Sequence, residues 1–426
     1  MNYLLLDGPL AIVCSAIATL GFLAKGSFVG TIGTIGTLFL FIVLAFLTPY
    51  QKDIIDFFTK KFTNTPAEAS KSYALIVSRF QRQDAKFDVT CLSALNYDSI
   101  YRVAAIEPDR EFVAGEHAHF AGGSGANTGY ILATHGKRVS VLGVVGEDEL
   151  GKRMLKELGD AKIDVSLVDS VGGNSGRTAI ISDARGQRLI VVDPDANLQI
   201  ATIFRGDRVA DIGTRIAASR VFHISSFAQH TSLIKPMQQV FSKLSDDIAV
   251  SYVPGDIQST HGLDDPYNGM IFRRADCIFI YEKHLENLLS STTSIPDVSS
   301  KSLKDRVNVL INWRLQTAKL RPFLLCVKKN IGVSDPSYVN YLSVFLCGYD
   351  VLKVIRPNNR SPDKTPKIYD STGAGDAAAA GVIAGLLDGL DLEEVAHRAL
   401  QNSLDIASSL GPRGKGRKVT DAIGDN

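Results

Sequence analysis

The stretch "IYDSTGAGDAAAAG", residues 368–381, places a glycine-rich turn between a strand-like start and a run of small residues. This order predicts a strand, a tight glycine turn and then a helix rich in alanine. The first N–H groups of a helix have no partner inside the helix, and together with the helix dipole they attract anions. Gly373, Ala374 and Gly375 carry little or no side chain, so a phosphate can approach their amides closely. The stretch therefore predicts an anion hole at the start of a helix.

Two acids flank this turn, Asp370 before the glycines and Asp376 after them. An acid beside an anion hole is explained if Asp376 accepts a proton from a hydroxyl group that attacks phosphorus. The alternative is that Asp376 caps the first turn of the helix, and local chemistry does not decide between the two. The glycines match neither a Walker P-loop, which needs a following Gly-Lys-Ser/Thr, nor the GxGxxG fingerprint.

The chain upstream of this turn, from Phe87 onward, alternates apolar runs of strand length with amphipathic runs of helical length. Strand candidates include "FDVTCLSAL", "RVSVLGVVG" and "ADCIFIY", and "DELGKRMLKELGDA" has helical spacing of its apolar residues. This alternation predicts an α/β fold with a parallel sheet covered by helices on both faces. Shorter strand-like pieces near 101–120 and 174–192 interrupt the alternation and predict a small separate sheet.

The first 50 residues differ from the rest, because residues 8–24 and 26–51 are free of charge and only Lys25 separates them. The second run exceeds the roughly 20 residues needed to cross the hydrocarbon of a bilayer. We expect a transmembrane hairpin or, failing that, a single span at 27–48.

Basic residues follow the second apolar run, and the positive-inside tendency then places the rest of the chain in the cytoplasm. These residues are Lys52, Lys60 and Lys61. We therefore expect a protein anchored in the membrane through residues 8–49, with a connector at 51–86 and a cytoplasmic domain at 87–426.

The overall charge gives no reason to expect nucleic acid as a partner, since 46 basic residues face 45 acidic ones. The only basic cluster of the sequence is Arg413-Gly-Lys415-Gly-Arg417-Lys418. Its composition favours a solvated tail, and contact with a phosphate is the alternative.

Four segments of the same chain carry a resemblance to a known family. The segment from Asp370 to Asp376 resembles the C-terminal signature of the PfkB, or ribokinase-like, family of carbohydrate kinases. "FAGGSGANTGYILATHGKRVSVLGVVGEDELGKRMLKELGDAKID" resembles the N-terminal signature, "LSALNYDSIYRV" the first strand with its substrate-binding acid, and "GQRLIVVDPDAN" the segment before the central helices. The resemblance extends over about residues 87–420.

The resemblance implies a ribokinase-like, mainly parallel sheet, a small β lid at 101–120 and 174–192, and transfer of phosphate from ATP with Mg²⁺. It implies Asp376 as the general base, with the amides of 373–376 as anion hole. A sugar or nucleoside would bind at Asp98, Gly122, Gly123 and Asn127, and the nucleotide at Asp370, Thr372, Lys328 and Gly332. The structural alternatives are a helix cap for Asn127 and a turn acid for Asp98. A homodimer through lid sheets or helix packing stays open.

The sequence departs from the family pattern at two places that serve magnesium and nucleotide. Tyr281 and His284 stand where the family commonly carries Asn-x-x-Glu, and a Thr-x-Gly-x-x-Gly segment keeps only Gly332. Lys328 in that segment contacts phosphate or lies in a solvated turn. Arg188 is expected to be an exposed charge, and contact with a substrate phosphate is the alternative. These departures keep open a second hypothesis, a membrane-bound protein that binds a ligand without catalysis.

Overall fold

The computed structural model describes residues 66–183, 187–206, 208–227, 230–317, 321–329, 342–357 and 368–414. The chain divides into two compact units, Met1–Asn64 and Thr65–Asn426, and every described residue belongs to the second. The membrane segment predicted at 8–49 lies outside the described residues. Among the described helices, none combines the length and the apolar character that crossing a bilayer requires.

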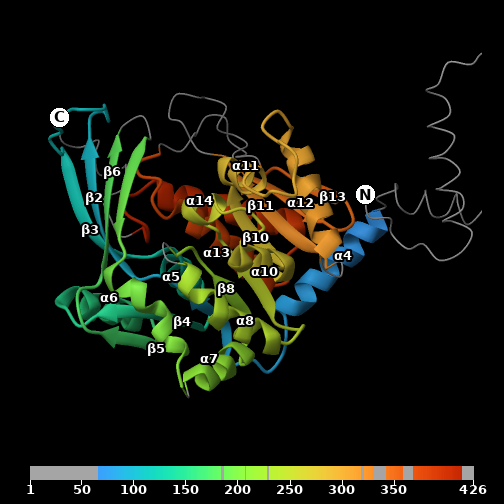
Figure 1. Ribbon diagram of the computed structural model, residues 1–426, viewed down its shortest axis with the longest axis horizontal. Coiled ribbons are helices and arrows are strands. Elements are labelled where there is room, and N and C mark those ends of the chain that lie inside the picture. Colours follow the sequence, from blue (N-terminus) through green and yellow to red (C-terminus); the bar gives the residue numbers. More distant parts are fainter. Residues whose placement is uncertain are drawn as a thin grey trace, which may run out of the picture. The chain divides into compact units, whose positions relative to one another are not determined.

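A nine-stranded sheet forms the centre of the described structure, in the order β13-β12-β11-β10-β9-β8-β1-β4-β5 (Figure 1). The pairs from β5 to β11 are parallel, and β12 and β13 join as antiparallel strands. The predicted parallel sheet is therefore confirmed, with an antiparallel edge that the sequence did not indicate. The strands are β1 (Phe87–Leu92), β4 (Val139–Gly146), β5 (Asp164–Val171), β8 (Ser219–Ile224), β9 (Ala249–Tyr252), β10 (Cys277–Tyr281), β11 (Phe323–Lys328), β12 (Leu342–Cys347) and β13 (Val351–Ile355).

Helices cover both faces of this sheet, so successive residues of its central strands enter two different cores. In β4, Val141 and Val145 belong to one core, whereas Leu142 and Val144 belong to the other. This is why the central strands read as continuous apolar runs. The helices are α4 (Pro66–Phe80), α5 (Ser124–Thr134), α6 (Glu149–Asp160), α7 (Arg208–Ala217), α8 (Ile234–Lys243), α9 (Asp256–Ser259), α10 (Pro266–Arg274), α11 (Glu282–Ser290), α12 (Leu303–Thr317), α13 (Ala374–Leu387) and α14 (Leu392–Ala407).

A second sheet of four strands lies at one end of the described structure, in the order β3-β2-β6-β7 (Figure 1). Its strands are β2 (Asn96–Val103), β3 (Glu116–Gly122), β6 (Gly176–Asp183) and β7 (Arg188–Asp193). They overlap the stretches in which the small sheet is expected, 101–120 and 174–192, although most of β2 lies before residue 101. The role of this sheet as a lid stays a prediction.

Helix α4 corrects one expectation, because the connector predicted at 51–86 includes residues 66–80. Ile76 and Phe80 on this helix are 0% exposed and belong to the same core as α13 and α14. The Tyr73 hydroxyl donates a hydrogen bond of 2.6 Å to the carbonyl of Leu390. The apolar face of α4 therefore docks on the compact unit instead of lying in a solvated linker.

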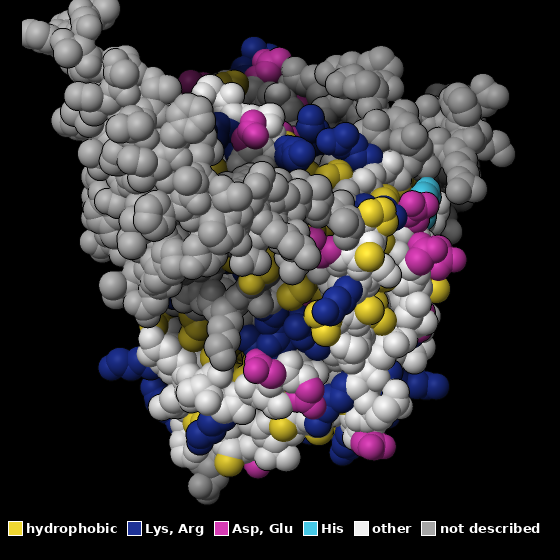
Figure 2. All heavy atoms as spheres, turned by 90° about the vertical axis from the view of Figure 1, so that its right-hand side faces the viewer, with side chains coloured by type: hydrophobic (Ala, Val, Ile, Leu, Met, Phe, Trp, Pro, Cys, Tyr) yellow, Lys and Arg dark blue, Asp and Glu magenta, His cyan; other side chains and the backbone are white. Residues whose placement is uncertain are grey.

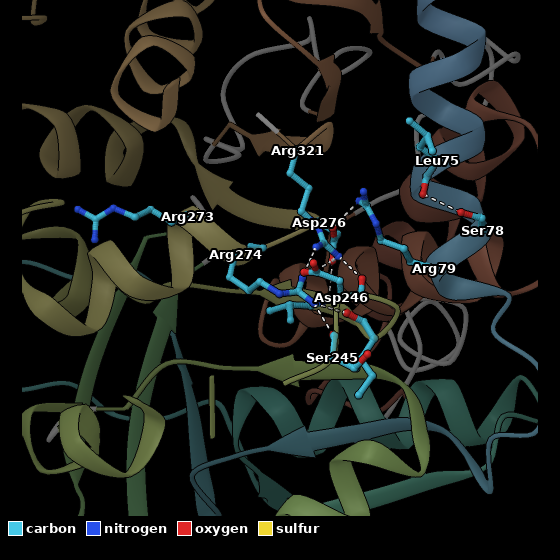
Figure 3. A network of polar contacts seen from close by, with 12 residues as sticks. Leu75, Ser78, Arg79, Ser245, Asp246, Arg273, Arg274, Asp276 and Arg321 are labelled. Carbon is cyan, nitrogen blue, oxygen red and sulfur yellow. Dashed lines mark hydrogen bonds and ion pairs between the residues drawn. The ribbon is translucent and has the colours of Figure 1, made fainter. Parts of the chain in front are cut away.

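A buried carboxylate fixes the end of α4 to the main sheet (Figure 3). Asp276, just before β10, is fully buried and accepts hydrogen bonds from Arg79 (2.7 Å), Arg274 (3.0 Å) and Arg321 (2.7 Å). It also accepts one from the amide of Val250 at 2.9 Å. Three cations around one buried acid form a polar cluster that joins α4 to the amino-terminal edge of the parallel strands.

The surface on the α4 side is rich in basic groups. In the view of Figure 2, from the side on which α4 lies in Figure 1, Lys and Arg side chains gather near the centre of the described surface. Hydrophobic side chains lie among them. The predicted transfer chemistry lies elsewhere, at the opposite, carboxyl-terminal edge of the parallel strands.

Candidate active site

Asp370 holds the glycine turn in shape and is 2% exposed. One of its oxygens accepts hydrogen bonds from the amide (3.0 Å) and the hydroxyl (2.8 Å) of Thr372, and the other accepts from the amide of Gly411 at 3.0 Å. Both carboxylate oxygens are therefore used within the protein. The geometry therefore supports a structural role for Asp370 and Thr372 in the turn, and not the predicted contact with the nucleotide.

Position 373 requires glycine for two reasons, its left-handed backbone conformation and the lack of space for a side chain. Its φ is +75°, and a Cβ there would lie 2.6 Å from Cα of Pro412. The amide of Ala374 donates to the carbonyl of Ser371 at 3.2 Å, so the turn already uses it. Within the described residues, the amides of Gly373, Gly375 and Asp376 donate to no backbone carbonyl. Of the predicted anion-hole amides, that of Ala374 is thus already in use, and those at 373, 375 and 376 remain available.

Asp376 does not cap helix α13, so the capping alternative is wrong. Its carboxylate oxygens accept hydrogen bonds from the Ser124 hydroxyl at 2.6 Å and from Nδ2 of Asn127 at 3.0 Å. Burial raises the pKa of Asp376, while these two hydrogen bonds and the charges of Lys328 and Arg413 act in the opposite direction. A buried carboxylate of this kind holds a proton more readily than an exposed one and is a stronger base when ionised.

Asn127 is not the cap of α5 either, because Gly123 occupies that position and Asn127 lies inside the helix. Its side-chain oxygen accepts a hydrogen bond from Nε of Arg413 at 3.1 Å. Arg413 also donates to Glu157 at 2.8 Å and is only 6% exposed. The prediction of a solvated basic tail is therefore wrong for Arg413, because backbone contacts of the preceding residues hold it inside.

Asp98 lies on β2 with its carboxyl group buried, and burial raises its pKa to about 7. Gly122 is next to it, and a Cβ there would approach an oxygen of Asp98 to 2.0 Å. Gly123 has φ +98°, and a Cβ there would lie 2.0 Å from the carbonyl oxygen of Ala94. The predicted substrate residues are thus brought together, but Asp98, Gly122, Gly123 and Asn127 line neither cavity described below.

A cavity of about 270 Å³ opens at the carboxyl-terminal ends of β10 and β11. Asp376, Gly373 and Gly375 line it at the start of α13, together with Ser124 from α5 and Lys328 from β11. Ligands of open α/β sheets commonly bind at this edge. The cavity therefore brings together most of the predicted catalytic turn.

Lys328 lies in this cavity wall, so the alternative of a solvated turn is wrong. Its Nζ is 3.2 Å from Oγ of Ser403 and 5.6 Å from the ring centroid of Tyr281, and burial lowers its pKa. Arg188 from β7 lines the same cavity instead of being a plain surface charge. Gly332, the remaining predicted nucleotide residue, lies outside the described residues.

The two residues that replace Asn-x-x-Glu, Tyr281 and His284, also line the cavity. The Tyr281 hydroxyl is so close to the turn that a Cβ on Gly375 would lie 3.1 Å from it. The neighbouring acid Glu286 on α11 does not line the cavity and pairs with Arg306 at 3.3 Å. No group of three or more His, Cys, Asp or Glu side chains in the described ranges is arranged to hold a metal.

A second cavity, of about 370 Å³, adjoins the first and shares Ile190, Ser226 and Gly255 with it. Its wall combines apolar side chains with a few polar ones from β7, α9, the start of β2, the 3-10 helix Asp195–Phe204 and the loops that follow β1 and β8. They are Val192, Pro194, Phe227, Ile257, Asn96, Asn197, Asp256 and Gln258, with Ala94. An acceptor molecule in the second cavity would extend toward Asp376 in the first.

Sequence reasoning missed Ser124 and Arg413 as neighbours of the base. Ser124 stands at the start of a helix and is indistinguishable from an ordinary cap in a single sequence. Arg413 belongs to a Gly- and Lys-rich stretch whose composition is typical of solvated segments. No local pattern announces that either residue approaches Asp376.

Comparison with known proteins supports the same family. A curated relative, an uncharacterized sugar kinase of Archaeoglobus fulgidus, is 25% identical over 269 residues, which cover 62% of this chain and 88% of that protein. A solved nucleoside kinase of Methanocaldococcus jannaschii shares the fold with a TM-score of 0.55 and 18% identity, and the match covers 79% of this chain and 96% of that one. The structure of Arabidopsis thaliana ribokinase complexed with ribose and ATP also shares it, with a TM-score of 0.55 and 17% identity over 79% of this chain and 97% of that one.

The sequence profile of the family described as pfkB family carbohydrate kinase matches residues 86–311 and 359–403, which is more than half of the chain. These ranges include both the first strand and the catalytic turn. The chain therefore belongs to the pfkB family of carbohydrate kinases and is a phosphotransferase that acts on an alcohol group.

Proposed function

We propose that this protein transfers the γ-phosphoryl group of ATP to a hydroxyl group of a sugar or a nucleoside, with Asp376 as general base. The observation that carries the proposal is that Asp376, the start of α13 and Lys328 line one cavity. Family membership supports the reaction class, and the relatives that support a sugar or nucleoside acceptor include both a sugar kinase and a nucleoside kinase.

Asp376 would accept the proton of the attacking hydroxyl group. Its burial supports this role, because a carboxylate with a raised pKa removes a proton more effectively near neutral pH. Ser124 and Asn127 hold its two oxygens in one orientation. An acceptor hydroxyl would replace or share one of these contacts on binding.

The charge that develops on the transferred phosphoryl group would be stabilised by donors around the turn. The amides of Gly375 and Asp376 point from the start of α13, where helix amides are unpaired. Lys328 would add a positive charge from β11, and the Tyr281 hydroxyl would add a donor opposite Gly375.

ATP as donor is supported by the family and by the ATP-bound Arabidopsis structure. Mg²⁺ usually binds through one or two carboxylates together with substrate phosphates. In the described part of the first cavity Asp376 is the acid that lines the wall, so Mg²⁺ would depend mainly on the nucleotide for its ligands. Bound there, it would neutralise phosphate charge during transfer.

The test is turnover of MgATP with a panel of pentoses, hexoses, sugar phosphates and nucleosides. Asp376→Asn should lower kcat by on the order of 10²-fold or more while the protein stays folded. Asp388→Asn is the matched control, since Asp388 ends the same helix and pairs with Lys137 at the surface. Full activity of Asp376→Asn would contradict the role of the base.

A nucleoside acceptor is favoured by the second cavity. Its apolar residues, among them Val192 on β7, Phe227 and Ile257, suit the faces of a nucleobase better than the hydroxyl groups of a free sugar. Such a base would lie in the second cavity while its sugar reached toward the first.

Substitutions of two neighbouring valines of β7 distinguish a nucleoside acceptor from a free sugar. Val192 lines the second cavity, whereas Val191 lines neither cavity and is 58% exposed. Val192→Ser should lower kcat/KM for nucleosides by about 10-fold and change it little for free sugars. Val191→Ser should change neither, and equal losses on both acceptor classes in Val192→Ser would contradict a base-binding cavity.

The alternative is a protein that binds its ligand without catalysis, and its motivation is that Tyr281 and His284 replace a motif that serves metal and phosphate. A protein of that kind would bind a sugar or nucleoside in calorimetry, yet would neither bind MgATP nor turn over any acceptor. Tight binding of MgATP by the full chain would count against it.

A further inference from the structure

A chain of hydrogen bonds leads from the surface to the proposed base through four separate parts of the sequence. Glu157 on α6 accepts from Nη1 of Arg413 at 2.8 Å, and Nε of Arg413 donates to Oδ1 of Asn127 at 3.1 Å. Nδ2 of Asn127 then donates to Asp376 at 3.0 Å. Each link joins residues that are far apart along the chain.

The direction of every link follows from the chemistry of Arg413. A guanidinium group has donors and no acceptor, so the side-chain oxygen of Asn127 must face it. The NH₂ group of Asn127 must then face Asp376, whose ionised carboxylate can only accept. A reversed amide would set the Asn127 oxygen against the carboxylate and leave an unfavourable contact between two acceptors.

We propose that Arg413 is a positioning residue for the base: it fixes the Asn127 amide so that its NH₂ group always faces Asp376, and Glu157 holds Arg413 for this task. Arg413 acts through Asn127 and does not line the first cavity. The inference rests on the proposed function in so far as Asp376 is the base.

The surroundings of Arg413 show that its place is built into the fold. The side chain lies over the ring of Tyr130, with 5.0 Å between the guanidinium carbon and the ring centroid. Its loop is fixed by the hydrogen bond from the amide of Gly411 to Asp370 and by the contact of Pro412 with Gly373. The same loop therefore shapes the catalytic turn and delivers Arg413 to Asn127.

Several charged and polar groups face Asp376 and set its protonation. They are Ser124 and Asn127 from α5, Lys328 from β11, Arg413, and the buried acid Asp98 from β2. Loss of Arg413 removes a positive charge and frees the Asn127 amide to turn. Both effects favour the protonated form of Asp376 and so raise its pKa.

The test is a titration of the Asp376 carboxyl carbon by NMR in full-length protein with ¹³C-labelled aspartate, with the signal assigned by its loss in Asp376→Asn. The variants are Arg413→Met, Arg413→Lys, Asn127→Leu and the double variant Arg413→Met/Asn127→Leu. Arg314→Met is the matched control, because Arg314 is also a buried arginine, stacks on Phe323 at 4.0 Å and bonds the carbonyl of Ala275.

Arg413→Met should raise the titration midpoint of Asp376 by about one pH unit or more, with a smaller rise in Arg413→Lys and none in Arg314→Met. The rise caused by Arg413→Met should be smaller in the Asn127→Leu background, since only the direct charge effect is left there. An unchanged midpoint, or a rise of equal size in both backgrounds, overturns the proposal.

Two further outcomes keep the proposal separate from the function. If no acceptor is turned over while Arg413→Met shifts the midpoint as expected, the proposed function fails and the positioning role stands. If Arg413→Met does not fold, Arg413→Lys and Asn127→Leu carry the test, and a wild-type midpoint in both overturns the role.

Discussion

Asp98 is an acid that the fold removes from water, and this makes stability depend on pH. Burial raises its pKa from 3.8 to about 7, so between these values the folded protein binds a proton that the unfolded chain has lost. The stability that this proton confers is fully present below about pH 4 and is lost as the pH rises through about 7. The direction is opposite to that of an acid held in an ion pair.

In the wild-type protein, the free energy of unfolding should therefore fall between about pH 5 and about pH 8, and in Asp98→Asn it should fall less. The amide cannot ionise, so the variant should gain a few kcal/mol relative to wild type on going from the lower to the higher pH. Urea unfolding at both values measures this, with the exposed Asp211→Asn as control. A difference between variant and wild type that is the same at both values would contradict the raised pKa.

Helix α4 and the cluster around Asp276 are features at the scale of elements. Removal of one partner from a buried ion cluster leaves uncompensated charge, which commonly costs about 3–5 kcal/mol. Asp276→Ala should therefore lower the free energy of unfolding by about that amount, because Arg79, Arg274 and Arg321 would all lose the buried carboxylate that compensates their charge. Arg79→Met should cost less, since two arginines remain on Asp276.

Chemical denaturation of both variants measures these losses, and Arg82→Met, two residues beyond the end of α4, serves as the control. Arg82 bonds the carbonyls of Ala217 and Ser219 and pairs with Asp247, outside the cluster. An Asp276→Ala protein as stable as Arg82→Met would contradict the importance of the cluster.

The elements that the sequence predicted well are those whose residues are buried on both faces. β4, β10 and β11 read as largely apolar runs, β1 is apolar at four of its six positions, and α6 showed its apolar face at helical spacing. Burial requires apolar residues at the buried positions, so the pattern of apolar residues in the sequence predicts these elements.

Features that depend on distant partners were not predictable in this way. α4 buries only one narrow face, so its polar composition favoured a connector. Arg413 is held inside by hydrogen bonds of its loop to Asp370, a contact across more than forty positions of sequence. The glycine turn was predictable because its glycines meet local requirements, a left-handed φ at Gly373 and close approach at Gly375.

At the scale of the whole molecule, α4 extends the catalytic unit beyond the matched family region, which starts at residue 86. A protein beginning at Thr65 should fold, whereas one beginning at Ala85 would expose the apolar surface that Ile76 and Phe80 cover. We expect the shorter protein to be less stable by several kcal/mol, or insoluble. Thermal unfolding of both proteins measures the difference, and equal melting temperatures would contradict the structural role of α4.

The apolar runs at 8–24 and 26–51 give a second prediction at this scale, from sequence alone. We propose that they attach the kinase to a membrane, so full-length protein should sediment with membranes and resist extraction by carbonate. The 65–426 protein should remain in the supernatant. Recovery of both proteins in the supernatant would contradict the anchor.

The loop that carries Arg413 has a consequence for the order in which the chain is made. Asn127 emerges from the ribosome early, Asp376 late and Arg413 later still, and domains begin to fold during synthesis. A nascent chain can thus form its sheet before the base acquires its full set of neighbours. We therefore expect phosphoryl transfer to reach its full rate only after the segment that carries Arg413 has been translated and its side chain has reached Asn127 on α5.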